Sequence, residues 1–426
     1  SIISNCTVTL DGTFTGNNGA LVCGLLRESK LVNCTTLGSG SISLGGAGAS
    51  GIVNYSQGSR ITNCTNNVNI NAQSGNTVSG GIAAMAYSLI LENCTNNADI
   101  INTNSDYLLY SAGIVGMLEG DGTHNLDNFI RNAVNNGRVE MTSEYNNDGI
   151  AAGIVAGFNT SSGKRALVNI EKCVNAGYIK GGDGASGIAY QIEGEVSNCA
   201  NYGIIESADD IAGINCLVGD NSNSRSEGNI EVGRVINEYN YYGNYTENII
   251  SPDADEDDFF DEQITGIRVD SLKINFNRGG TPCTTRQMVG SALADDLPGD
   301  WDFAENLYPL PAGLNPNDPR NKLARMPIIL RSEGLNRFEN MSVVISDFTL
   351  PQVDGVTWES SSPDIVSVPS GGGVATVTHP QADSLVTITA TCEGISKTYT
   401  ISVHSANGVS ADNPIIIHNG TEFLKM

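Results

Sequence analysis

Basic residues are scarce in this chain. Its 426 residues include 22 Lys and Arg against 47 Asp and Glu, so the formal net charge is −25 at pH 7. Nucleic-acid binding needs a basic surface that displaces counterions from phosphate, and adhesion to anionic lipid also needs basic surface. The charge balance therefore argues against nucleic acid and against an anionic membrane surface as partners.

Long apolar runs and aromatic residues are also few. No stretch approaches the ~18 apolar residues of a membrane span, so no membrane insertion is expected. Aromatic residues make up 6% and apolar residues 40% of the chain, which predicts a core of aliphatic and small side chains. No signal peptide is visible, and the chain opens inside a repeat at residues 1–3. We therefore expect a piece of a longer protein.

The motifs of common catalytic centres are missing as well. The sequence contains no Gly-x-Ser-x-Gly, no His-Glu-x-x-His and no P-loop. It also lacks a Cys-x-x-Cys pair, which argues against zinc. No Asp or Glu recurs in register along the repeats, as the paired carboxylates of a glycan-cleaving enzyme would. Asp99 and Glu140 are the nearest candidates, and we expect no enzyme.

What the chain does contain is a repeat. The stretch Ile-Thr-Asn-Cys-Thr-Asn-Asn at 61–67 recurs as Leu-Glu-Asn-Cys-Thr-Asn-Asn at 91–97. Each copy is accompanied by a small-Gly-apolar signal, such as Gly80-Gly81-Ile82 or, in the first copy, Cys23-Gly24-Leu25. A period of about 30 residues with two fixed landmarks is typical of a solenoid. Weaker copies of the first stretch begin at Ile3, Leu31, Ile130, Ile170 and Val196.

Each repeat is interpreted as three short strands, placed at the cysteine unit, around residues such as Ile70, and at the small-Gly-apolar signal. Strands this short are stable only when they pair with the next coil, and parallel crossovers are almost always right-handed. Residues 1–250 are therefore predicted to form a right-handed parallel β-helix. A tight turn follows the cysteine unit, and its glycines, Gly137, Gly177 and Gly203, suit the left-handed conformation.

Two repeat positions are predicted to form ladders of identical side chains. Equivalent residues of stacked coils lie ~4.8 Å apart, a Cα–Cα distance that a disulfide can span. Parallel side chains, however, do not present the dihedral angle that a disulfide requires. Buried free thiols are therefore favoured, with disulfides and metal binding as the alternatives. The cysteine ladder contains Cys6, Cys34, Cys64, Cys94, Cys173 and Cys199. The amide ladder, expected at one corner of the coil, contains Asn66, Asn96, Asn135, Asn175 and Asn201.

The recurring Cys-x-Asn-x-Gly-x-Ile followed by Ala-Gly-Ile resembles the GLUG-type repeats of large bacterial surface and secreted proteins. The resemblance covers about the first 310 residues, including a short helix expected near 284–296. It implies that residues 251–330 form a C-terminal cap over the last coil, whose exposed strand edges need cover. The prolines at 309–319 are interpreted as a stiff connector at the end of this cap.

Residues 331–404 change character. Short segments alternate apolar and polar residues between turn signals, which predicts a small β-sandwich. The run Trp358-Glu359-Ser360-Ser361-Ser362-Pro363 and the strand after it resemble bacterial Ig-like domains, which in that family are mostly spacers. Residues 405–426 resemble the start of a further, truncated repeat module.

An acidic run near 253–262 departs from the repeat family and is open to two interpretations. It is either a solvated loop or a Ca²⁺ site, because hard cations bind several carboxylate oxygens. The EF-hand pattern is absent from it. The candidate ligands are Asp253, Asp255, Asp257, Asp258 and Asp261.

A tyrosine cluster at the end of the repeats also has two interpretations. Its rings either close the end of the coil stack or form a flat platform for a sugar, because aromatic faces pair well with amphipathic ligands. The cluster contains Tyr239, Tyr241, Tyr242 and Tyr245.

The sequence therefore predicts an all-β chain with a non-enzymatic, extracellular or cell-surface role. We expect an adhesin or stalk whose solenoid face or inserted loops, at 104–111, 119–129 and 141–149, meet a glycan or a host surface protein. One alternative is a carbohydrate-active β-helix enzyme, a polysaccharide lyase or hydrolase. Another is a structural module whose ends, near Ile2-Ile3 and 415–417, associate head-to-tail.

Overall fold

In the computed structural model, the regular secondary structure of the described residues is almost entirely β-strand. No helix in the described part combines the length and the hydropathy that a membrane span requires. The described residues are 1–403 apart from 73–77, 104–108, 120–127, 143–148, 160–166, 183, 191–192, 208–209, 213–224, 228, 232–234, 238–245, 249–279, 283–287, 293, 295–296, 298–299, 331–342, 345–347 and 379–383.

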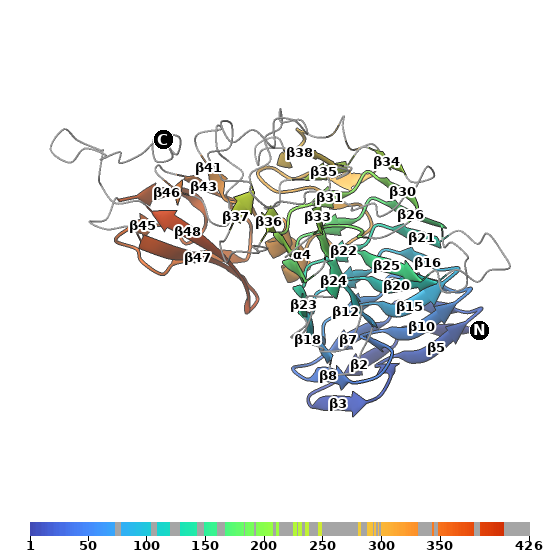
Figure 1. The fold of residues 1–426 in the computed structure, drawn as a ribbon. Coiled ribbons are helices and arrows are strands. Elements are labelled where there is room, and N and C mark those ends of the chain that lie inside the picture. Colours follow the sequence, from blue (N-terminus) through green and yellow to red (C-terminus); the bar gives the residue numbers. More distant parts are fainter. Residues whose placement is uncertain are drawn as a thin grey trace.

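The repeats wind into a parallel β-helix, as predicted, in which the coils stack along one axis (Figure 1). A complete coil contributes one strand to each of five sheets, which we name A to E in chain order. Equivalent repeat residues are register partners: Ile61 pairs with Leu31 of the coil before and with Leu91 of the coil after. The first five coils contain all five strands, and the described residues of the sixth add to sheet E only a bridge between Val155 and Ala189.

The strands of sheets A and B flank the cysteine position. Sheet A contains β1 (Ile2–Ser4), β6 (Lys30–Val32), β11 (Arg60–Thr62), β16 (Ile90–Glu92), β21 (Asn128–Arg131), β26 (Leu167–Glu171), β30 (Glu193–Ser197) and β34 (Arg225–Glu227). Sheet B contains β2 (Thr7–Thr9), β7 (Thr35–Leu37), β12 (Thr65–Asn66), β17 (Thr95–Asn96), β22 (Val134–Asn135), β27 (Val174–Asn175), β31 (Ala200–Asn201), β35 (Asn229–Glu231) and β38 (Gly280–Pro282).

The other three sheets complete the coil. Sheet C contains β3 (Thr13–Gly16), β8 (Ser41–Leu44), β13 (Asn69–Ala72), β18 (Ile100–Thr103), β23 (Val139–Thr142), β28 (Ile179–Gly181), β32 (Ile205–Ser207), β36 (Val235–Asn237) and the antiparallel β37 (Thr246–Asn248). Sheet D contains β4 (Gly19–Ala20), β9 (Ala49–Ser50), β14 (Val78–Gly80), β19 (Leu109–Ala112), β24 (Gly149–Ala152), β29 (Gly184–Ser186) and β33 (Asp210–Ala212). Sheet E contains β5 (Cys23–Arg27), β10 (Val53–Gln57), β15 (Ala83–Tyr87), β20 (Val115–Glu119) and β25 (Val155–Asn159).

A coil thus has five strands, where the sequence predicted three. The small-Gly-apolar signal is not a strand but the tight corner between sheets D and E. Its first copy was also placed wrongly, because Gly19 pairs with Ala49 and Cys23 with Val53, so Leu21 rather than Gly24 is the counterpart of Gly51. Strands of two or three residues are too short to show a period of their own.

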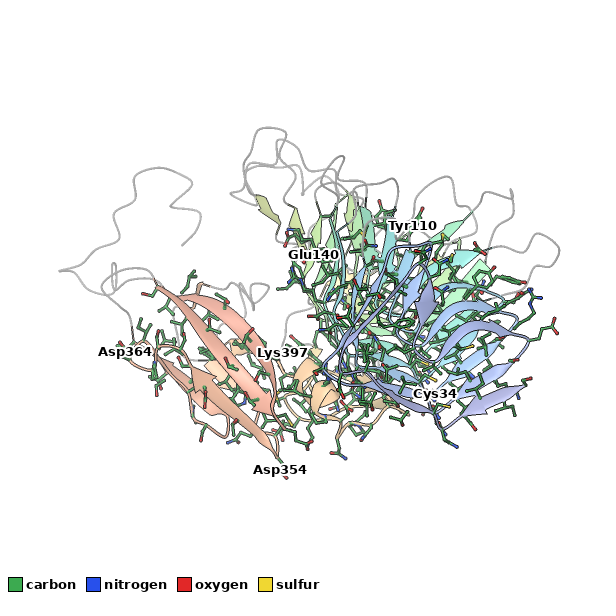
Figure 2. All side chains as sticks on the ribbon, turned by 90° about the horizontal axis from the view of Figure 1, so that it is seen from below. Cys34, Tyr110, Glu140, Asp354, Asp364 and Lys397 are labelled. Carbon is green, nitrogen blue, oxygen red and sulfur yellow. The ribbon has the colours of Figure 1, made fainter. Side chains whose placement is uncertain are left out.

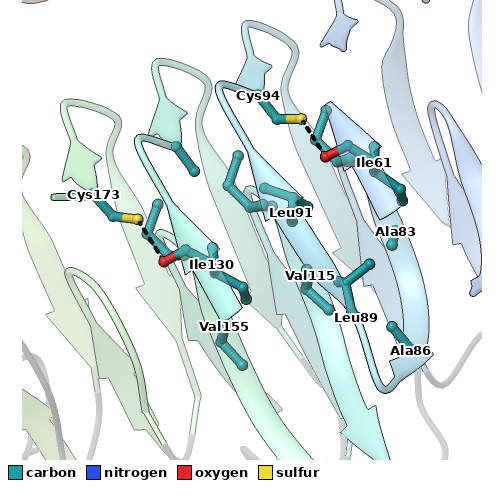
Figure 3. Packing of buried hydrophobic residues seen from close by; sticks show 14 of the residues in the cluster. Ile61, Ala83, Ala86, Leu89, Leu91, Cys94, Val115, Ile130, Val155 and Cys173 are labelled. Carbon is teal, nitrogen blue, oxygen red and sulfur yellow. Dashed lines mark hydrogen bonds between the residues drawn. The ribbon is translucent and has the colours of Figure 1, made fainter. Parts of the chain in front are cut away.

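The interior contains two apolar clusters. The larger lies between sheets A and E, where the residue three places before each cysteine, such as Ile61 or Leu91, packs near Ala83 and Val115 (Figure 3). The smaller lies between sheets C and D and includes Ile70. Full burial of an aliphatic side chain contributes about 1.5–3 kcal/mol. Stacking therefore supplies the stability that such short strands lack alone.

The turn glycines are required for a different reason from the one predicted. Gly137, Gly177 and Gly203 do not have a positive φ, so the left-handed prediction is wrong. A Cβ on any of the three would lie 1.9 Å from a backbone oxygen of the preceding coil, for Gly177 the oxygen of Gly137. The coils approach too closely here for any side chain.

The left-handed position shared by the first seven coils is instead the residue before the cysteine position. Asn tolerates this conformation better than other residues with a side chain, which explains its recurrence at this place. Its side chain also links the coils: Asn33 Nδ2 donates to Asn5 Oδ1 at 3.1 Å, and Asn63 Nδ2 to Asn33 Oδ1 at 3.0 Å. The residues with φ between 52° and 56° at this place are Asn5, Asn33, Asn63, Asn93, Asn132, Lys172 and Asn198.

The proline-rich segment, residues 300–328, is folded against the flank of the solenoid. It includes the prolines at 309–319, which were predicted to form a stiff connector. It contains β39 (Trp301–Asp302), β40 (Leu310–Pro311) and α4 (Pro319–Ala324). Its apolar side chains, including Trp301 and Leu310, pack on Val134 and Val174 of sheet B. Among the described residues of the cap, β38 alone continues a sheet at the end of the stack, by pairing with β35. The described part of the predicted cap therefore covers the flank as well as the end.

Helix α4 joins this segment to both neighbours. Asp318 caps the helix by accepting hydrogen bonds from backbone N–H groups of its first turn, and Pro319 follows at a position that needs no N–H. Asn136 of the solenoid donates from Nδ2 to Asn321 Oδ1 at 2.9 Å. The backbone oxygen of Ala324 accepts from Lys397 Nζ at 3.2 Å. The helix is thus held between the solenoid and the sheets that follow (Figure 1).

Two small sheets complete the described chain, as the alternating pattern predicted. One contains β41 (Ile329–Leu330), β43 (Phe348–Leu350), β46 (Gly373–Val377) and β45 (Val366–Ser367), all antiparallel. The other contains β42 (Val343–Val344), β48 (Ile395–Val403), β47 (Ser384–Cys392) and β44 (Val356–Ser360), antiparallel apart from the β42–β48 pair. Their shared core is built around Trp358 and Phe348 and also takes in Leu323 and Met326.

Candidate functional site

The connections between the strands of a coil differ in how much their length varies from one coil to the next. Two residues join sheet A to sheet B in each of the first seven coils, and two join sheet D to sheet E in each of the first five. The C–D connection varies from two residues, at 17–18, to six, at 143–148. The E–A connection varies from two residues, at 28–29, to eight, at 120–127. The insertions therefore border sheets D and E, and that side is the candidate binding face.

The outer face of sheet E carries two rows of side chains in register. One row runs Leu25, Tyr55, Met85 and Met117, and each is the register partner of the next. The other row runs Arg27, Gln57, Tyr87 and, in β20, Glu119. The residues between them, Leu26, Ala86 and Leu118, are buried in the core. Leu25 is 56% exposed, and Tyr55, Met85 and Tyr87 are half-buried.

Polar contacts fix parts of these rows. Arg27 Nε donates to Gln57 Oε1 at 2.7 Å, and Tyr55 OH donates to Glu119 Oε2 at 2.7 Å, two coils away. The rings of Tyr55 and Tyr87 meet edge to face with centroids 6.0 Å apart. Burial and then the hydrogen bond to Glu119 raise the pKa of Tyr55, which therefore stays a neutral hydroxyl. The face presents one ordered array of aromatic, thioether and polar groups.

The corner between sheets D and E is filled by side chains. Tyr110 and Tyr190 are buried there with Met117. A Cβ on Gly157 would lie 2.3 Å from the Tyr110 ring, and a Cβ on Gly184 would lie 2.1 Å from that of Tyr190. Both tyrosines and Met117 are thus packing residues, and the accessible surface is the rest of the two rows beside them.

The two candidates for an enzyme, Asp99 and Glu140, do not face each other as an acid–base pair. Asp99 Oδ1 accepts the backbone N–H of Arg138 at 3.0 Å, and Glu140 forms an ion pair with the Arg138 guanidinium. Glu140 is instead the register partner of Lys180, which pairs with the buried carboxylate of Glu206.

Two more contacts complete this cluster on sheet C. Tyr178 OH donates to the other oxygen of Glu206, and the Arg138 guanidinium lies over the Tyr178 ring, 5.4 Å from its centroid. The five side chains form a charge-balanced cluster of two cations, two carboxylates and one phenol. Figure 2 shows Glu140 on the solenoid and Lys397 on the neighbouring sheets.

The cysteines of the repeat lie inside the coil as free thiols. Each Sγ donates to the backbone oxygen two residues earlier, and from the third coil on also to an oxygen of an earlier coil, such as Ile61 O for Cys94 (Figure 3). Burial raises the pKa of Cys34 to about 11 and that of Cys173 well above its ordinary value. Ala133 interrupts the ladder between Cys94 and Cys173. The thiols are therefore packing groups with little thiolate character.

The five asparagines of sheet B are brought together in one buried ladder. Each Nδ2 donates at 2.9 Å to the Oδ1 of the next coil, from Asn66 through Asn96, Asn135 and Asn175 to Asn201. Thr36 precedes them and donates to Asn66 Oδ1 at 2.7 Å. These amides are fully buried and hydrogen-bonded to each other, so their role is structural.

Several candidates lie outside the described residues. These are the tyrosine cluster (Tyr239, Tyr241, Tyr242 and Tyr245), the proposed Ca²⁺ ligands (Asp253, Asp255, Asp257, Asp258 and Asp261), the segment 405–426 and most of the helix expected near 284–296. At the other end, Ile2 is 68% exposed.

Sequence reasoning missed the rows on sheet E and the cluster around Glu206. Neither repeats an identical residue from coil to coil, so a search for recurring motifs passes over them. Both become visible once the coils are aligned, because residues 25, 55, 85 and 117 share one position of the repeat.

Comparison with known proteins adds no family assignment. No protein-family model, no curated protein and no solved structure matches this chain. Within the described ranges, no group of three or more His, Cys, Asp or Glu side chains is arranged to hold a metal ion. Function has to be inferred from the coils themselves.

Proposed function

We propose that this chain is a non-enzymatic binding module of an extracellular surface protein, an adhesin whose solenoid meets a glycan or a protein of a host. The observation that supports this most is the restriction of insertions to the two borders of sheets D and E. A repeat protein binds where its surface is free to vary while the stack stays constant.

The resemblances point in the same direction. The coils resemble GLUG-type repeats and the small sandwich resembles bacterial Ig-like domains, both of which belong to large bacterial surface and secreted proteins. The joint at 300–328 fits a protein of this kind, because its side chains take part in both the solenoid flank and the sandwich core. Such a joint suits a stalk that presents a binding face at a fixed angle.

The experiment is a binding screen of the full chain against glycan and host-protein panels. A second chain has its connections at 120–127 and 160–166 shortened to two residues, the length found at 28–29, 58–59 and 88–89. Selective binding by the parent that weakens in the shortened chain supports the adhesin. Failure of the parent across both panels would leave only a spacer role. Thermal unfolding of both chains checks that the fold is retained.

A carbohydrate-active enzyme is a second candidate because of the cluster on sheet C. Glu206 is a buried carboxylate that contacts both a lysine and a tyrosine, a combination able to move protons. Glycan turnover that disappears in Glu206→Gln and Lys180→Met would support it. If turnover is absent, or is unaffected by these changes, the cluster is an ion-pair ladder that only stabilises sheet C.

A further inference from the structure

The two rows on sheet E repeat at the spacing of the coils. Neighbouring strands of a sheet lie ~4.8 Å apart, so Leu25, Tyr55, Met85 and Met117 stand at that interval along the solenoid axis. This interval is similar to the length of one pyranose in an extended glycan chain. A ligand with the same repeat could therefore make an equivalent contact at every coil.

We propose that the outer face of sheet E binds a neutral, extended polysaccharide along the solenoid axis, with one sugar residue per coil. This inference rests on the proposed function and names its ligand and its contact residues. The accessible part of the first row, from Leu25 to Met85, contacts the C–H faces of the rings. In the second row, Arg27, Gln57 and Glu119 form hydrogen bonds with the hydroxyl groups, and the ring of Tyr87 makes a further contact with a C–H face.

The chemistry of each row fits this division. Tyrosine rings and methionine thioethers are broad, polarisable surfaces that suit ligands with one apolar and one polar side. Arg27 and Gln57 offer N–H donors, and Glu119 offers carboxylate oxygens, so the second row both donates and accepts, as hydroxyl groups do. Arg27 is exposed at the edge of this row.

Charge and strand pairing disfavour the main competing ligands. A chain of net charge −25 repels polyanions such as uronate or sulfated polymers, and Arg27 is the one cation in the described rows. A peptide strand binds by adding to a free sheet edge, but β10, β15 and β20 are each paired on both sides, so within the rows such an edge is present only at β5. A neutral glycan lying across the strands needs no free edge.

The full chain is titrated with neutral oligosaccharides of two to six residues, built from glucose, xylose or mannose. Heparin, polygalacturonate and an unstructured peptide serve as comparison ligands. At least one neutral series should bind, with a Kd that falls with length up to about four residues, because three coils expose the first row and the fourth adds Glu119 of the second. Heparin and polygalacturonate should not compete.

Three variants locate the site. Tyr87→Ala should raise the Kd about 2- to 10-fold, and Tyr87→Phe should restore most of the loss, because the ring makes the contact. Arg27→Ala should raise the Kd by a similar factor. Phe129→Ala, which removes a 40% exposed aromatic from sheet A, should leave the Kd unchanged.

The outcomes separate this inference from the proposed function. If a glycan or protein binds but the Tyr87 and Arg27 variants match the parent, the sheet E site is wrong and the adhesin proposal stands. Binding of polyanions alone, or of the peptide alone, overturns the neutral-glycan assignment. If no ligand of any class binds, both proposals fall.

Discussion

Asn135 Nδ2 donates a 2.9 Å hydrogen bond to Asn175 Oδ1 of the next coil, and both side chains are fully buried. The same Asn135 nitrogen donates to Gly137 O at 2.9 Å, and Asn135 Oδ1 accepts from Asn96 at 2.9 Å. One amide thus holds its own turn and both neighbouring coils. The interior of the solenoid is stabilised by a continuous row of side-chain hydrogen bonds as well as by apolar packing.

Replacing Asn135 by Leu should destabilise the solenoid strongly. The change removes the partner of the Asn96 amide and of the Gly137 carbonyl, and each buried group left without a partner costs about 1–3 kcal/mol. The midpoint of urea unfolding should fall accordingly. Asn63→Gly is the matched control, because Asn63 belongs to the outer ladder and has φ 53°, which glycine adopts without strain. An equal loss in both variants would contradict a special role for the buried ladder.

Gly177→Ala should also unfold the solenoid at lower denaturant. The new Cβ would lie 1.9 Å from Gly137 O, a backbone atom of the preceding coil that cannot move without separating the coils. We expect a loss of about 1–3 kcal/mol, as for overpacking of a core. Gly24→Ala is the control, since no atom lies within 4 Å of its Cβ position, and it should change stability by less than about 0.5 kcal/mol. Similar midpoints for the two variants would show that the coils yield at this turn.

The parts of the fold that the sequence could predict are those that repeat identical residues. The residue before each cysteine, the cysteine itself and Asn66 with its equivalents recur, so the coils and the parallel stacking were predictable. The five sheets were not, because β12 and β17 have two residues each and carry no periodicity. The first coil was misaligned because Leu21 occupies the place of Gly51.

The candidate site was harder to predict than the fold. Its rows contain four different residues, Leu25, Tyr55, Met85 and Met117 for one of them, and they become neighbours only through register. The proline-rich segment failed for a related reason. Its composition indicates a stiff chain, but its burial depends on Val134 and Val174, more than a hundred residues earlier in the sequence.

The stability of the solenoid should fall at alkaline pH. Burial raises the pKa of Cys34 from the ordinary value of 9.0 to about 11, so an unfolded thiol ionises before the folded one does. The folded state then holds more protons, and the stabilisation, complete below pH 9, is lost as the pH rises to about 11.

Urea unfolding of the parent and of Cys34→Ala between pH 8 and pH 11 tests this expectation. Lysines and tyrosines also titrate in that range, so the difference between the two chains is the quantity of interest. Alanine already occupies the equivalent position at Ala133, so the variant should fold. The advantage of the parent should shrink with rising pH, and a constant difference would rule out the thiol as its source.

Arg325→Leu should loosen the segment between the solenoid and the sandwich. The Arg325 side chain is 3% exposed and donates to the backbone oxygens of Tyr308 and Asp302, both at 2.7 Å. Losing it leaves two carbonyl groups without these donors, at about 1–3 kcal/mol each. Hydrogen exchange should quicken over residues 301–311 but not in sheet C.

Lys322→Leu provides the comparison for Arg325→Leu. Lys322 belongs to the same region, but its Nζ makes an exposed contact with Asp354 O at 3.2 Å. Its removal should leave exchange over 301–311 unchanged. Unchanged exchange in the Arg325 variant would show that apolar packing alone holds the segment.

The attachment of residues 300–328 to the solenoid flank determines how the chain responds to tension. A force applied to the sandwich first meets the contacts of α4 and the apolar segment with the middle coils, at Asn136, Val134 and Val174. These contacts are sheared together, whereas a stack pulled from its end peels one coil at a time. We therefore expect the segment to detach from the flank before the load reaches the last coil.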